Sequence, residues 1–172
     1  MHFSWFNLFE RRQNMFNIGD MIAHPMHGAG VIDSITEKCI NGVTRQYYVL
    51  KLPAGGMVVL IPVESCDAIG VRPIVSPETA EKIIQALPEL DSEMTSNWNR
   101  RYHENMLRIK SGDLIEVARV VKGLMTRDAE KGLSTGERKM LYFAKQILIS
   151  EIVLSQNSTY DEVEARINTC IA

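Results

Sequence analysis

The sequence has no run of the roughly 18 consecutive apolar residues that a membrane-spanning helix needs, because charged residues interrupt every apolar stretch. Its three cysteines, Cys39, Cys66 and Cys170, form no C-x-x-C pair, so neither a disulfide framework nor a zinc knuckle is indicated. The motifs of phosphate-binding loops, dinucleotide folds, zinc proteases and serine hydrolases are also missing. We therefore expect a soluble cytoplasmic protein that is not an enzyme and carries no cofactor.

Residues 1–14 are treated as an N-terminal extension. Their apolar stretch precedes the basic pair Arg11-Arg12, which is the reverse of the order in a secretory signal. The segment from Met15 to Asp20 has the features of a natural domain beginning. We do not expect export, and the fold prediction starts at residue 15.

The net charge of -2 conceals an uneven distribution. Residues 15–72 hold four basic and five acidic residues, whereas residues 93–155 hold eleven basic and eight acidic ones. Phosphate groups of a nucleic acid would therefore bind to the C-terminal half.

The segment from Asp20 to Val71 has the pattern of short strands rich in β-branched and aromatic residues. Asn41-Gly42 predicts a tight hairpin turn between strands at 29–38 and 45–52, since type I′ turns need positive φ at both central residues. The apolar run 57–61 predicts a strand buried on both faces or against a partner. Residues 15–72 are thus expected to form a small Tudor- or SH3-like β-barrel.

Beyond Pro73 the apolar period becomes helical. We expect a connector (73–95) with a helix that starts at Ser76-Pro77-Glu78, and then an all-α helical bundle (96–172). Capping boxes at Ser134–Glu137 and Thr159–Glu162 mark two helix starts in the bundle. The fold class is α+β, with a β-domain followed by a helical domain.

Candidate chemistry is sparse. His24 and His27 are three residues apart, but Pro25 and Gly28 make this segment a turn, and no third ligand completes a metal site. Cys39 and Cys66 are interpreted as small core residues, because no basic neighbour is evident that would lower a thiol pKa. We predict neither a metal site nor a catalytic site.

The cluster Trp98-Asn99-Arg100-Arg101-Tyr102-His103 combines aromatic and guanidinium groups, which suits nucleic-acid contact. Trp98, Tyr102, Met106 and Ile109 are also spaced four, four and three apart as in a buried helical stripe, and the spacing alone favours a core position. Arg138 and Lys139 fall in the first turn of a helix, where cations oppose the helix dipole. Nearby phosphates would explain them, and so would a simple solvated face.

A family resemblance is carried by several segments: Gly19-Asp20, His27-Gly28-Ala29-Gly30-Val31, Tyr48-Val49-Leu50-Lys51, Gly70-Val71-Arg72, Asn97-Trp98-Asn99-Arg100-Arg101-Tyr102, Ser111-Gly112-Asp113, Gly136-Glu137 and Ala144-Lys145-Gln146-Ile147-Leu148. With these, the chain resembles the CarD/CdnL family of bacterial transcription regulators over nearly all of residues 16–155. The resemblance implies a Tudor-like domain that docks on the β subunit of RNA polymerase. It also implies a helical domain that reaches promoter DNA at the upstream edge of the transcription bubble, without a membrane or a small-molecule substrate.

The resemblance also implies site residues. Trp98 matches the family tryptophan that wedges into the minor groove and steadies the open complex, and Arg100 matches a phosphate-contacting arginine. Arg138 stands where the family usually has lysine on the DNA surface, and Arg101 and Lys139 are its neighbouring candidates. His103 departs from a basic family position.

On the polymerase side, the candidates are three residues of the β-domain. Lys38 stands where some members have arginine, and Leu60 replaces another basic residue, which would shift the contact toward apolar packing and strand pairing. Ile40 is compatible with such a surface.

The alternative hypothesis is a protein-interaction adaptor that does not bind DNA. Its helical half would dimerise or bind a protein, and Trp98 would be buried in the core.

Overall fold

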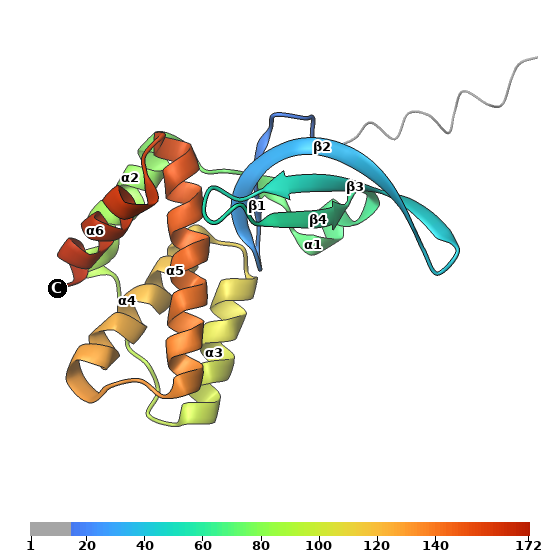
Figure 1. Cartoon of the computed structure of the whole chain (residues 1–172). Helices are drawn as coiled ribbons and strands as arrows, with labels where there is room; N and C mark the ends of the chain where they lie inside the picture. Colours follow the sequence, from blue (N-terminus) through green and yellow to red (C-terminus); the bar gives the residue numbers. More distant parts are fainter. Residues whose placement is uncertain (1–14) are drawn as a thin grey trace, which may run out of the picture.

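The structure is a computed structural model that describes residues 15–172, so the N-terminal extension lies outside it. Its first part is a five-stranded antiparallel sheet with the order β4-β3-β2-β1-β5. The strands are β1 (Met21–His24), β2 (Gly28–Ile40), β3 (Val43–Lys51), β4 (Val58–Pro62) and β5 (Arg72–Pro73), and a 3-10 turn (Val63–Ser65) with helix α1 (Cys66–Ile69) stands between the last two strands. Figure 1 shows that β2 arches over the sheet and that the β2–β3 hairpin points away from the helices. The predicted α+β class with an N-terminal β-domain is confirmed.

The predicted hairpin turn joins β2 to β3. Asn41 and Gly42 have φ angles of 53° and 77°, the positive values that a type I′ turn requires. Pairing continues from Ile40 opposite Val43 down to Val31 opposite Lys51, with one irregularity between Ile32 and Ser34. The local turn chemistry therefore sets the register of the longest strand pair.

The β-domain has its own core beneath the curved sheet. Tyr48 is fully buried, and its hydroxyl group both donates to the Phe16 carbonyl and accepts from the Phe16 amide, each at 3.0 Å. A buried hydroxyl needs such partners, since an unsatisfied one costs about 1–3 kcal/mol. The remaining core side chains are Ile22, Ile32, Leu50, Ile61, Cys66 and Val71.

Of the two alternatives for the 57–61 run, burial on both faces within the sheet is wrong, and burial against a partner stays a prediction. β4 lies at the edge of the sheet, where Ile61 is 1% exposed but Val58 is 48% and Leu60 is 38% exposed. A continuous apolar run can therefore place every second side chain on an open face.

The helical part contains α2 (Pro77–Ala86), a 3-10 turn (Leu87–Glu89), α3 (Trp98–Lys110), α4 (Leu114–Lys131), α5 (Thr135–Gln156) and α6 (Tyr160–Ile171). Both predicted capping boxes are present, at Ser134–Glu137 and Thr159–Glu162. The central helix α5 contacts α2, α4 and α6 (Figure 1). None of the helices within residues 15–172 is long and apolar enough to cross a membrane.

The segment 73–95, expected as a connector, packs as part of the helical domain. Ala80, Ile83 and Ile84 of α2 belong to the same buried cluster as the inner faces of α4 and α5. Lys122 of α4 donates to the carbonyl groups of Pro88 and Leu90. Lys122 therefore holds the segment after α2 in place.

The two domains meet at β1–β2 and α5. A Cβ atom added to Gly28 would lie 2.5 Å from Ser150 Oγ, and this hydroxyl accepts the Ala29 amide at 3.0 Å. Beside it, Arg72 makes a bidentate ion pair with Glu151, whose side chain is 1% exposed. Direct packing and a buried charge pair thus fix the β-domain against the helices.

Candidate nucleic-acid interface and protein-docking face

Trp98 is the first residue of α3 and lies on the surface. Asn97 caps the helix by accepting the Arg100 amide at 2.9 Å. The indole is 43% exposed and stacks on Tyr102, with ring centroids 5.3 Å apart and an angle of 21° between the planes. Tyr102 is itself 37% exposed. The core position favoured by the spacing is therefore wrong for both aromatic residues.

The buried side of α3 is formed by Arg101, Asn105 and Ile109, which are four residues apart. The predicted core position is therefore correct for Ile109, and Met106 is partly buried against the same core. Polar side chains can occupy it because they find partners there. Asn105 Nδ2 lies 3.6 Å from the sulfur of Met94, and Arg101 pairs with Glu137 of α5.

The prediction that Arg101 contacts DNA conflicts with its placement. The residue is 2% exposed. Its Nε donates to Glu137 Oε1 at 2.7 Å, and its Nη1 donates to the carbonyl groups of Thr95 and Ser96 at 2.9 and 3.0 Å. All three guanidinium nitrogens of Arg101 thus have partners inside the domain. Arg101 is therefore no longer a candidate for the DNA-contacting surface.

The other basic candidates lie near the starts of two helices, α3 and α5. Arg100 is exposed and pairs with Glu104 at 2.8 Å. Arg138 and Lys139 are exposed in the first turns of α5. The two helix starts touch, because Trp98 Nε1 donates to Ser134 Oγ at 3.0 Å. We refer to Trp98, Arg100, Tyr102, Arg138 and Lys139 as the aromatic–basic surface.

Beneath this surface, the buried carboxylate of Glu137 accepts hydrogen bonds from Ser134 and Arg101. Burial acts to raise the pKa of this carboxyl, but hydrogen bonds from Arg101 and Ser134 outweigh burial and hold the pKa below its ordinary value. Glu137 therefore stays ionised and paired at neutral pH. Sequence reasoning used Ser134 and Glu137 only as a helix-start signal and did not connect them to Trp98, because the link joins residues 36 positions apart.

The three candidates for polymerase binding lie on one face of the sheet. Lys38 pairs with Arg45 and Ile40 with Val43, while Leu60 pairs with Val49. Paired residues share a face, and alternate residues of β3 return to that same face. Lys38, Ile40 and Leu60 therefore lie on the same face of the sheet. They are spread along the stretch of β3 from Val43 to Val49, which is about 20 Å long.

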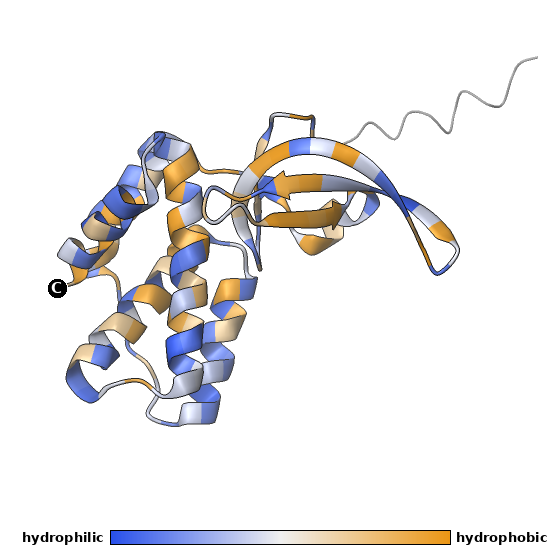
Figure 2. Cartoon of the chain, viewed as in Figure 1, coloured by the Kyte–Doolittle hydropathy of each residue, from blue (hydrophilic) through white to orange (hydrophobic). Residues whose placement is uncertain are grey.

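This outer sheet face, defined by Lys38, Ile40, Val43, Arg45, Val49, Val58 and Leu60, exposes an unusual amount of apolar surface. Ile40, Val43 and Val58 are 53%, 51% and 48% exposed. Figure 2 shows the apolar colour along β4 and near the hairpin tip, with hydrophilic colour between. β4 is an edge strand, and a free edge can pair with a strand of another chain.

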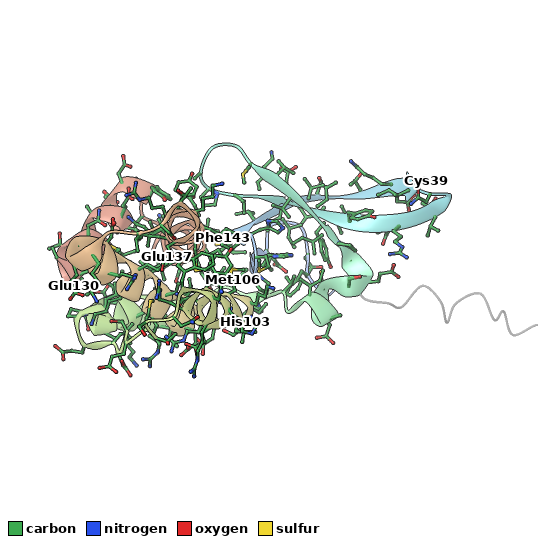
Figure 3. The ribbon with its side chains drawn as sticks, turned by 90° about the horizontal axis from the view of Figure 1, so that it is seen from below. Cys39, His103, Met106, Glu130, Glu137 and Phe143 are labelled. Atoms are coloured by element: carbon green, nitrogen blue, oxygen red, sulfur yellow. The ribbon has the colours of Figure 1, made fainter. Side chains whose placement is uncertain are left out.

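The remaining candidate groups do not assemble into a reactive site. Within residues 15–172, no group of three or more potential metal ligands is found. His24 and His27 lie with ring centroids 4.5 Å apart, and His24 Nδ1 accepts the Met26 amide. Burial raises the pKa of the Cys66 thiol, which agrees with a core residue. Cys39 is exposed at the hairpin end (Figure 3), so its predicted core position is wrong.

Two exposed surfaces thus lie on different domains, one apolar and one aromatic and basic. Comparisons with known proteins identify the family. Residues 16–75 match the family model of the CarD-like/TRCF RID domain, and residues 82–168 match that of the CarD C-terminal domain. The chain is 36% identical over 151 residues to "Putative transcription factor YdeB" of Bacillus subtilis (strain 168), which covers 88% of this chain and 99% of that relative.

The chain therefore belongs to the CarD/CdnL family of transcription regulators. This is a family of transcription factors and not of enzymes, and it indicates a partner in the transcription machinery.

Proposed function

We propose that this protein binds the β subunit of bacterial RNA polymerase through the outer sheet face and stabilises the promoter open complex with Trp98. The observation that carries the proposal is the exposure of Trp98, 43%, at the start of α3, where it contacts the start of α5 and where both helix starts carry exposed cations. The family membership gives the context, because the two matched domains cover both surfaces.

On the DNA side, the chemistry suits the edge of a melted region. An exposed aromatic ring can stack on or wedge against a base step that has lost its neighbour, and base–aromatic stacking is worth about 1–3 kcal/mol. Arg100, Arg138 and Lys139 would contact phosphate groups, which fixes position without reading sequence. The contact is therefore expected to be largely independent of sequence and to weaken as salt rises.

On the polymerase side, the outer sheet face offers apolar packing and the edge strand β4, whose outer edge pairs with no strand of residues 15–172. Leu60 and Ile40 provide exposed apolar area, and Lys38 adds a single positive charge at the hairpin end. Lysine cannot make the two-pronged contact of arginine with a carboxylate. The affinity for polymerase would therefore depend more on Leu60 and the β4 edge than on ion pairing.

The packed junction between the domains would couple the two contacts. Once the β-domain is bound, the helical domain is held at a high effective concentration near DNA, provided that the geometry allows both contacts. Arg72, Glu151 and the close approach of Gly28 to α5 supply this geometry. A weak DNA contact can then matter within the ternary complex.

The adaptor hypothesis loses its main premise. It required Trp98 in the core of the helical domain, whereas the indole lies on the surface. An exposed, stacked aromatic pair beside cations favours a nucleic-acid partner.

Binding to purified bacterial polymerase and to fragments of its β subunit tests the proposal. Wild type should bind, and Leu60→Glu should weaken binding by about tenfold or more, because it places an unpaired charge in an apolar contact. Leu107→Glu is the matched control, since this leucine of α3 is 55% exposed outside the outer sheet face. If wild type binds no β-subunit fragment, the proposal is wrong.

A further inference from the structure

The hydroxyl of Ser134 uses its full hydrogen-bonding capacity. A serine hydroxyl can donate one bond and accept two. Ser134 Oγ donates to Glu137 Oε2 at 3.0 Å, and it accepts the Glu137 amide at 3.2 Å and the Trp98 indole N–H at 3.0 Å. One atom thus serves both the cap of α5 and the exposed tryptophan of α3.

Glu137 fixes this hydroxyl. Its Oε2 also accepts the Ser134 amide at 3.1 Å, and its Oε1 accepts from Arg101 at 2.7 Å. Arg127 of α4 adds a second guanidinium group 3.6 Å from the same oxygen. Figure 3 shows Glu137 inside the helical domain, where its side chain is 4% exposed. The orientation of Ser134 is therefore tied to three helices.

The ring of Trp98 is held on further sides. Tyr102 stacks on it, and a Cβ atom at Gly136 would lie 3.4 Å from its Cζ2 atom. The absence of a side chain at Gly136 lets the six-membered ring approach the backbone of α5. The indole is thus partly exposed, yet its nitrogen end and one ring edge are bound.

We propose that Ser134 and Glu137 are positioning residues for Trp98. They fix the indole in one orientation before DNA arrives, and they occupy its single polar atom, so the part that faces outward is hydrocarbon. This inference rests on the proposed role of Trp98 at the bubble edge. It explains how the contact can have one fixed geometry and still not discriminate between bases.

Two physical consequences follow from this arrangement. An indole that is already fixed loses little conformational freedom on binding, and ordering a free side chain would lower affinity by about three- to tenfold. An indole N–H is a donor and has no acceptor function. With this donor satisfied by Ser134, Trp98 contributes stacking and shape and cannot read a base edge.

The test uses full-length protein with Trp5→Phe, so that Trp98 is the only tryptophan. Ser134→Gly removes the hydroxyl but retains a residue that caps helices nearly as well as serine. Ser134→Thr retains the hydroxyl and should restore wild-type behaviour. Thr159→Gly is the matched control, because Thr159 forms the same capping box on α6.

Two readouts are compared. The first is hydrogen exchange of the indole N–H in free protein, which Ser134→Gly should accelerate by about three- to tenfold, the worth of one neutral hydrogen bond. The second is the lifetime of the open complex with polymerase, which should shorten by a similar factor. Ser134→Thr and Thr159→Gly should change neither readout.

The outcomes separate the two claims. If wild type prolongs the lifetime and Trp98→Ala abolishes the effect, but Ser134→Gly behaves as wild type in both readouts, the positioning role is refuted and the proposed function stands. If wild type itself leaves the lifetime unchanged, the proposed function fails, and exchange of the indole N–H still reports whether Ser134 holds the ring.

Discussion

The Arg72–Glu151 pair gives the most quantitative prediction about how the two domains are joined. The Glu151 carboxylate is 1% exposed and accepts two bonds from Arg72, at 2.5 and 3.0 Å, and one from the Val75 amide at 3.0 Å. Arg72→Met removes the only charged partner that Glu151 has within residues 15–172 and leaves a buried carboxylate with the Val75 amide as its remaining partner. Such a loss costs about 3–5 kcal/mol, and we expect about 3 kcal/mol, since Arg72 is 32% exposed and water can partly replace it.

Urea unfolding should show this loss as a lower midpoint with an unchanged slope. Arg100→Met is the matched control, because the Arg100–Glu104 pair is 72% and 41% exposed and such pairs contribute about 0–1 kcal/mol. The double variant Arg72→Met, Glu151→Met should be more stable than Arg72→Met alone, since it no longer buries an unpaired charge. If the Arg72 and Arg100 variants lose the same stability within about 0.5 kcal/mol, the buried ion pair does not join the domains as described.

Further predictions concern the domain junction, the histidine turn and the DNA contact. Gly28→Ala should cost at least about 2 kcal/mol more in urea unfolding than Gly42→Ala, because both glycines have positive φ but only the Cβ at Gly28 would meet α5, and equal losses would contradict the close approach. Burial, with a smaller contribution from the neighbouring His27, lowers the pKa of His24 to about 4, so the unfolded chain binds more protons between about pH 6.5 and 4 and stability falls as the pH drops through that window. His24→Asn should flatten this part of the pH dependence, and an unchanged profile would exclude His24 as its source. Replacing both Arg138 and Lys139 with Gln should reduce the slope of log affinity against log salt by about 0.7–0.9 per lost phosphate contact, whereas an unchanged slope would remove them from the DNA surface.

Local chemistry predicted much of the fold. Asn41-Gly42 located the longest hairpin because its positive φ angles are a property of two residues. The capping boxes at Ser134 and Thr159 located two helix starts for a similar reason, since the cap forms within four residues. Such features are readable from one sequence because their partners are close in the chain.

The wrong predictions concern side chains whose burial depends on residues far away in the chain. The spacing of α3 gave a correct helical period and a correct buried position for Ile109, but it was wrong for Trp98 and Tyr102. At that end of the helix Arg101 is buried instead, because it pairs with Glu137, 36 residues away. The run that forms β4 is apolar throughout, and only its edge position shows that Leu60 faces outward. Periodicity fixes which residues share a face, whereas the choice of the buried face depends on the rest of the fold.

The lifetime of the promoter open complex with a bacterial polymerase tests the central claim most directly, measured with wild type, Trp98→Ala, Leu60→Glu and the control Leu107→Glu at two salt concentrations. The account predicts that wild type and the control prolong the lifetime, and that Trp98→Ala and Leu60→Glu each abolish the effect while remaining folded. A wild-type protein that leaves the lifetime unchanged, or a Trp98→Ala variant with the full effect, would contradict it.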